Sequence, residues 1–154
     1  MTDSRSLASS LGRRAVLLGA GGAAATSLGA PFISRAQAAD EVRIGLLLAK
    51  TGDIAAQTEY LANGSMLALE MRGSKLMGKP ASLVWYDEPS PQGAQQNMQK
   101  LVQEAGAVAV LGGALSSSAL AEQATALRLK VPFIIDNAAA TDITGKNCNR
   151  YTFR

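Results

Sequence analysis

Residues 41–154 alternate between short apolar runs and longer segments with helical periodicity, and this alternation is the strongest constraint on the fold. Short runs rich in Val, Ile and Leu are typical of strands buried on both faces of a parallel sheet. We expect strands at 42–48, 81–86, 107–111 and 131–135, a fifth starting at 151–153, and helices at 58–72, 91–105 and 117–129. This order predicts an α/β fold with a parallel, doubly wound sheet and right-handed crossovers.

The apolar spacing also predicts the inward face of each helix. Gly73, Gly78 and Pro80 end the first helical unit, and Ser90-Pro91 predicts an N-cap followed by proline at the first helical position. The predicted inward residues are Ala62, Met66 and Leu69 in the first helix, Ala94, Met98, Leu101, Val102 and Ala105 in the second, and Leu120, Ala124 and Leu127 in the third.

The first 38 residues have the pattern of a secretory signal peptide. Arg13 and Arg14 precede an uncharged run at 15–34, and Ala36-Gln37-Ala38 has the small residues of a cleavage site. The arginine pair before a Gly/Ala-rich core resembles a twin-arginine signal. We therefore expect the twin-arginine export machinery as a partner, cleavage near Ala38 and a periplasmic mature protein. An uncleaved anchor is the alternative, because the run is just long enough to span a bilayer.

The sequence GAGGAA at 19–24 imitates a dinucleotide-binding turn, with Asp40 about twenty residues further on. That motif requires a strand, the glycine turn and a full helix. Here Gly29-Ala30-Pro31 interrupts the helix, and no second strand precedes Asp40. We therefore expect no nucleotide cofactor at this position.

Charge and composition exclude several function classes. The net charge of +3 comes from residues 1–38, where four arginines face Asp3 alone, which leaves 11 basic and 11 acidic residues in the remainder. A neutral mature chain does not indicate nucleic-acid binding. The chain has no histidine, and Cys148 is its only cysteine, so an internal disulfide or a thiolate metal cluster is excluded. Without a nucleophile elbow or phosphate loop, we expect no enzyme, no cofactor and no metal.

Ligands of open parallel sheets bind beyond the carboxyl ends of the strands, where this chain has three suggestive loops at 49–57, 112–118 and 136–141. The serine run at 116–118 lies where a strand becomes a helix, which favours binding of a carboxylate or another anion. The carbonyls of the loop at 136–141 and the Thr141 hydroxyl suit an ammonium group. The alternatives are a serine that merely caps the helix and a plain connecting loop.

Asp87 and Glu88 follow the second predicted strand as a pair of carboxylates. Two neighbouring carboxylates can serve as acid and base. The preferred interpretation is a solvated charge pair before a helix N-terminus, which attracts negative charge.

At these loops the chain resembles the branched-chain amino-acid (Leu/Ile/Val) substrate-binding protein family of ABC importers. The resemblance runs from about Val42 to Arg154. It is carried by the pieces VRIGLLLAKTGDIAA, KLMGKPASLVWYDEPSPQGAQQNMQKLV, AVLGGALSSSALA, VPFIIDNAAATD and NRYTFR, in this order and spacing.

The resemblance implies a type I periplasmic binding fold, in which two α/β lobes joined by a hinge close on the ligand. Residues 39–154 would then be an incomplete N-terminal lobe. By similarity, Ser116 donates its hydroxyl to the ligand α-carboxylate, Ser117 donates its N–H, the Ala139 carbonyl accepts the ammonium group, Thr141 contacts the ligand, and Gln57 lines the cleft. Asp136-Asn137 is a departure, because many relatives have Ser-Pro there.

The expected function is to capture a small amino-acid-type solute and deliver it to a membrane permease driven by ATPase subunits. Another amide, a urea-like compound or an aromatic acid is an alternative ligand. A ligand-sensing receptor ectodomain of the same fold and an exported α/β oxidoreductase are the alternative functions. Because one lobe does not enclose a ligand, we expect amino-acid binding by the isolated chain to be undetectable by titration calorimetry.

Overall fold

The computed structural model describes residues 41–154, so the predicted signal peptide and its glycine-rich turn lie outside the described residues. Within this range no helix has the length and apolar character needed to cross a membrane. The elements are β1 (Val42–Leu47), α1 (Ala55–Glu70), β2 (Lys75–Leu76), β3 (Lys79–Tyr86), α2 (Pro91–Gln103), β4 (Ala109–Gly112), α3 (Ser116–Leu129), β5 (Phe133–Ile135), the 3-10 helix η2 (Thr141–Ile143) and β6 (Thr152–Phe153).

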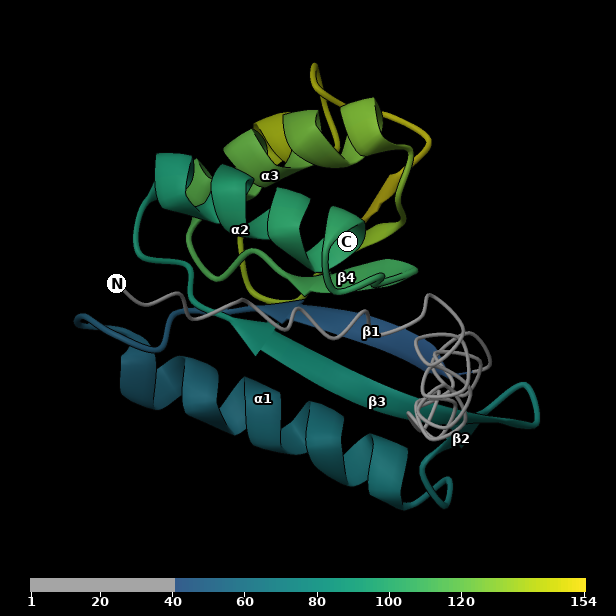
Figure 1. The fold of residues 1–154 in the computed structure, drawn as a ribbon. Helices are drawn as coiled ribbons and strands as arrows, with labels where there is room; N and C mark the ends of the chain where they lie inside the picture. Colours follow the sequence, from purple (N-terminus) through teal and green to yellow (C-terminus); the bar gives the residue numbers. More distant parts are fainter. Residues whose placement is uncertain (1–40) are drawn as a thin grey trace, which may run out of the picture. The chain divides into compact units, whose positions relative to one another are not determined.

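The strands form one sheet in the order β2-β3-β1-β4-β5-β6, and every neighbouring pair is parallel except β2 and β3. Helix α1 covers one face of the sheet, while α2 and α3 lie on the other (Figure 1). The predicted doubly wound α/β fold is therefore confirmed. The parallel arrangement places the carboxyl ends of β1, β4 and β5 side by side at one edge, where the candidate loops begin.

The antiparallel hairpin of β2 and β3 was not predicted from the sequence, which indicated only a break between helix and strand. Its two-residue turn consists of Met77 and Gly78, with φ angles of 52° and 79°. Positive φ at both central positions is the geometry of the tight hairpin turn that matches strand twist. Pro80 is accepted because it lies near the start of β3, opposite Lys75 of the two-residue edge strand.

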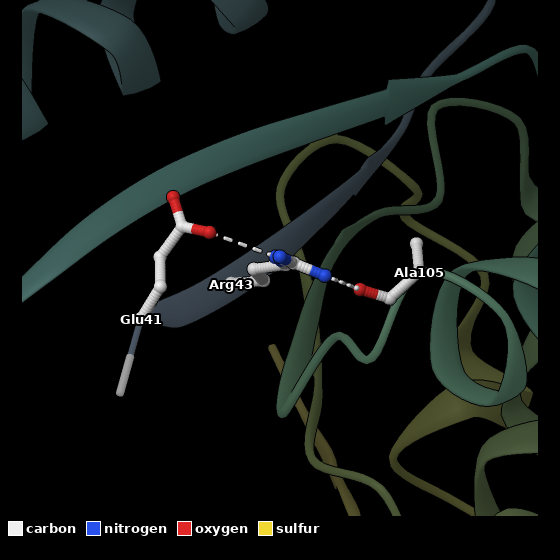
Figure 2. A network of polar contacts seen from close by, with 3 residues as sticks. All are labelled: Glu41, Arg43 and Ala105. Atoms are coloured by element: carbon white, nitrogen blue, oxygen red, sulfur yellow. Dashed lines mark hydrogen bonds and ion pairs between the residues drawn. The ribbon is translucent and has the colours of Figure 1, made fainter. Parts of the chain in front are cut away.

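The core has two layers, one on each face of the sheet. Leu47, Val110 and Phe133 pack with Met98 and Leu101 of α2 on one side, and Leu46 and Leu48 pack with Ala62 of α1 on the other. At the start of β1, the Arg43 guanidinium ties the strand to the loop after α2. It donates to the Glu41 carboxylate at 2.9 Å and to the Ala105 carbonyl at 3.1 Å (Figure 2).

The predicted inward faces have different outcomes in the three helices. In α2, Ala94, Met98 and Leu101 are buried as predicted, and the Ser90 hydroxyl accepts the Gly93 N–H at 3.1 Å as an N-cap. In α1, Ala62 is buried, but the Met66 side chain is 37% exposed.

In α3 the prediction is wrong. Ala124 is exposed, Leu127 is 47% exposed and Leu120 is half-buried. The buried residues of this helix are Ser118, Ala119, Glu122, Gln123, Thr125 and Ala126. Two of the polar side chains on the inward face, Gln123 and Thr125, have hydrogen-bond partners there. The Gln123 amide, for example, donates to the carbonyls of Ile143 and Asn147 at 2.9 and 2.7 Å.

Candidate ligand-binding site

The turn between β4 and α3 and the loop after β5 are held together at the carboxyl edge of the sheet. The Ala138 N–H donates to the Gly113 carbonyl at 2.9 Å, and the Asn137 side-chain amide donates to the Ala114 carbonyl, also at 2.9 Å. These bonds replace ladder pairing where the strands end. Two of the three candidate loops therefore form one continuous surface.

The N-terminus of α3 presents backbone donors to this surface that have no partner among the described residues. The N-cap residue is Leu115, which provides no side-chain cap, and the first helical hydrogen bond runs from the Ala119 N–H to the Leu115 carbonyl. The N–H groups of Ser116 and Ser117 precede that bond and have no acceptor within the helix. Neither serine caps the helix as an N-cap residue. Free N–H groups at the positive end of a helix dipole favour an anion.

The Ser116 hydroxyl joins the helix to the loop that contains the other predicted residues. Its oxygen accepts the Ala140 N–H at 3.2 Å. A hydroxyl that accepts one hydrogen bond keeps its own proton for donation. Ala139 and Thr141 flank Ala140 and are both exposed. The structure therefore brings Ser116, Ala139 and Thr141 together, with Ser117 exposed beside them.

Arg154 is a neighbour of this surface that the sequence reasoning missed. Its guanidinium donates to the Ala140 carbonyl at 3.1 Å. Its position in the sequence could have indicated this, because Arg154 directly follows β6. Strand β6 pairs in parallel with β5 and therefore ends at the same edge of the sheet. Arg154 adds positive charge next to the loop at 138–141, which again favours an anionic ligand.

Gln57 lies apart from this group. It is exposed in the first turn of α1, and no described contact links it to Ser116 or to the loop at 138–141. A cavity of about 470 Å³ lies nearby, lined by Lys50, Ala55, Ala56, Glu59 and Trp85. There the Lys50 ammonium sits 4.8 Å from the centre of the Trp85 ring. A contact between Gln57 and ligand stays a prediction.

Asp87 and Glu88 are not a solvated charge pair, so that interpretation was wrong. Glu88 is only 2% exposed, and its two oxygens accept the N–H groups of Ala114 and Leu115 at 3.0 and 3.2 Å. The half-buried Asp87 accepts the Lys50 N–H at 2.6 Å and the Thr51 hydroxyl at 3.0 Å. Asp87 is therefore bonded to the loop after β1, and Glu88 to the turn between β4 and α3. The two carboxylates reach different loops because successive side chains after β3 point to opposite faces.

Three carboxyl groups near the site, the buried Glu88 and Glu122 and the exposed Asp136, have raised pKa values. Desolvation raises the pKa of Glu88, although the bonds from Ala114 and Leu115 oppose it. Burial, followed by the charges of Glu88 and Asp136, raises the pKa of Glu122 well above its usual range. Desolvation raises the pKa of Asp136 to about 6. Each of these three carboxyl groups therefore loses its proton at a higher pH than the same group does in water.

Glu122 was also missed from the sequence. The only signal was its spacing of four residues from Ser118, which places both side chains on one face of α3. Within residues 41–154, no three His, Cys, Asp or Glu side chains are arranged to hold a metal ion.

The comparisons with known proteins agree with the fold. A family model described as periplasmic binding protein matches residues 41–154. No curated protein sequence matches the chain.

Three solved structures resemble the described part. An ABC-type branched-chain amino acid transporter from Rhodopseudomonas palustris is 29% identical, with a TM-score of 0.70 over 73% of this chain and 32% of its own. A solute-binding protein of an ABC transporter from R. palustris, in complex with benzoate, is 31% identical, with a TM-score of 0.68 over 74% and 32%. The substrate-binding protein LivJ from Streptococcus pneumoniae, in complex with isoleucine, is 26% identical, with a TM-score of 0.67 over 73% and 33%.

The chain spans about a third of the length of these structures. The family match covers every residue that the structure describes, including both loops of the candidate site. The chain therefore belongs to the periplasmic binding protein family.

Proposed function

We propose that this chain belongs to the substrate-binding component of an ABC importer, and that it captures a small solute that carries a carboxylate. One observation carries the proposal. The unpaired N–H groups of Ser116 and Ser117 lie next to the loop at 138–141, to which Ser116 is hydrogen-bonded. A helix N-terminus with free donors binds a carboxylate without any cationic side chain.

An amino-acid ligand fits the two halves of this surface. Its carboxylate receives the Ser116 hydroxyl and the Ser117 N–H, while the Ala139 carbonyl and the Thr141 hydroxyl accept its ammonium group. An aromatic acid has only the first of these groups. Relatives with isoleucine and with benzoate both exist, so the contacts on the ammonium side separate the two ligand classes.

In this proposal the solute is delivered to a membrane permease and its ATPase subunits. Delivery depends on conformation, because a ligand that bridges two lobes stabilises their closed arrangement. The twin-arginine-like segment at 1–38 is removed near Ala38, and the mature protein works in the periplasm. The family match supports an exported location.

The first test is an NMR titration of the ¹⁵N-labelled chain with L-isoleucine, benzoate and acetate. The described lobe presents one wall of a cleft, so we expect a dissociation constant on the order of 1 mM or weaker, which calorimetry does not detect as micromolar binding. The amide signals of Ser116, Ser117, Ala139 and Thr141 are expected to move with isoleucine. Acetate, which has no ammonium group, is expected to move only those of the two serines.

Substitution Ser116→Ala is expected to weaken isoleucine binding about fivefold, since one hydrogen bond contributes about 1 kcal/mol. The matched control is Ser65→Ala, because the Ser65 hydroxyl bonds within α1 to the Leu61 carbonyl. Equal shifts with isoleucine and benzoate on the serines alone would favour an aromatic or simple acid. Shifts scattered over the molecule and indifferent to Ser116→Ala would refute the site.

A further inference from the structure

Helix α3 places a carboxyl group in the protein interior without a hydrogen-bond partner. The Glu122 side chain is fully buried, and neither of its oxygens forms a hydrogen bond within the described residues. Ser118 lies one turn earlier on the same helix face and is also fully buried. Its hydroxyl interacts with the Glu88 carboxyl, yet it makes no hydrogen bond of normal geometry in this part of the chain.

The charged groups that act on Glu122 are both acidic. They are Glu88, which follows β3, and Asp136, which follows β5. Helix α2 packs against α3 with the uncharged side chains of Met98 and Leu101, and its Gln95 amide is bonded to the Ala121 carbonyl. On the η2 side, Asp142 is paired with the exposed Lys146 at 2.8 Å, and near β6 the exposed Arg154 is bonded to the Ala140 carbonyl.

Among the described residues, an ionised Glu122 would therefore be shielded from solvent and would have no hydrogen bond and no neighbouring cation. A buried charge without these partners is far more costly than a buried neutral acid. Glu88 differs, because two backbone N–H groups and the helix N-terminus stabilise its negative charge. Of the two glutamates beneath the β4–α3 turn, Glu122 is the one that keeps its proton.

We propose that Glu122 is a neutral carboxylic acid in the folded chain, and that its proton allows an ionised Glu88 to hold the β4–α3 turn, so that anion binding above the turn weakens when Glu122 ionises. A second negative charge beside Glu88 would repel it and would oppose a ligand carboxylate at Ser116 and Ser117. The effect on ligand affinity rests on the proposed function. The protonation state of Glu122 and its effect on the turn do not.

The sign of the pH dependence follows from the raised pKa of Glu122 in the folded state. The folded chain keeps this proton at pH values where the unfolded chain has lost it. The free energy of unfolding therefore falls as the pH rises from about 4.5, and it stops falling above the folded pKa. Asp136 contributes in the same direction only up to about pH 6, and Glu88, whose pKa is also raised, contributes in the same direction. The share of Glu122 is therefore the part of the pH dependence that Glu122→Gln removes.

The experiment is a ¹³C NMR titration of the glutamate carboxyl carbons, together with the amide signals of Ala114 and Leu115, from pH 4 to 10. We expect the Glu122 carboxyl carbon to titrate well above pH 4.5. Part of the shift of the Ala114 and Leu115 amides is expected to follow this titration. The variant Glu122→Gln, a neutral mimic of similar shape, is expected to lose that part of the shift, while Glu104→Gln at the exposed end of α2 keeps it.

A Glu122 carbon that titrates near pH 4.5 would overturn the proposal, and this readout needs no variant to fold. If the amide signals of Ala114 and Leu115 do not shift when Glu122 ionises, the proposed link between Glu122 and the β4–α3 turn is wrong. If benzoate and isoleucine shift no signal at any pH, the proposed function fails while the protonation result still stands.

Discussion

Gly112 is the position where the structure leaves least room for a side chain. It ends β4, is buried and pairs with Leu47 of β1. A Cβ at position 112 would overlap the Leu47 carbonyl oxygen and lie 3.0 Å from the carbonyl carbon. These are backbone atoms of the central strand, which no rotamer change can move. The substitution Gly112→Ala therefore forces β1 and β4 apart at this register position.

The expected cost follows from the hydrogen bonds that such an opening strains. About two buried backbone groups lose their partners, each at about 1–3 kcal/mol, so we expect a loss of about 2–6 kcal/mol. Gly45→Ala is the matched control in β1. Its Cβ would lie 3.1 Å from Leu101 Cδ1 and 3.3 Å from Val110 Cγ2, which are side-chain ends that can shift, for about 1–2 kcal/mol.

The assay is urea unfolding followed by the fluorescence of Trp85, the only tryptophan of the chain. The two variants and the wild type are compared at equal m-value, so that the midpoints report stability. A Gly112→Ala variant within about 1 kcal/mol of wild type, or one more stable than Gly45→Ala, would contradict the reasoning. It would mean that the strand pair tolerates the extra carbon.

Two further predictions concern single side chains. Because the pKa of Asp136 is raised from 3.8 to about 6, chiefly by desolvation, stability is expected to fall as the pH rises through this window. Asp136→Asn should reduce the pH dependence of the urea midpoint between pH 4 and 7. An unchanged pH dependence would mean that it arises from another group. Ser90→Ala removes the cap hydrogen bond of α2 and is expected to cost about 1 kcal/mol in the same assay. No loss would mean that water replaces the cap.

The fold was predictable from the sequence where an element carries a local signal, such as a capping residue or an amphipathic spacing. Ser90-Pro91 and the apolar stripe of α2 gave the correct start and inward face, because capping and amphipathic spacing are local properties. The hairpin at Met77-Gly78 escaped notice because its turn lacks the usual Asn-Gly or Asp-Gly pair. The inward face of α3 was wrong because burial of Gln123 depends on carbonyls of a loop distant in sequence.

Part of the candidate site was likewise predictable from the sequence, and part of it was not. Ser116, Ala139 and Thr141 were predictable as neighbours because parallel strands send their loops to one edge. Glu88 and Glu122 were not. A glutamate is normally exposed, and only the three-dimensional packing shows Glu88 beneath the Ala114 and Leu115 amides. The same packing shows Glu122 enclosed beside it.

The two edge strands of the sheet, β2 and β6, differ in how readily they can associate with other chains. On one side, the two-residue β2 has an exposed Lys75 and faces a proline-containing stretch of β3. Short, charged margins of this kind discourage intermolecular strand pairing and therefore aggregation. The opposite margin is β6, where the apolar Phe153 is 54% exposed. Aggregation at high protein concentration is therefore expected to begin at β6, and a charged residue at position 153 is the most direct way to suppress it.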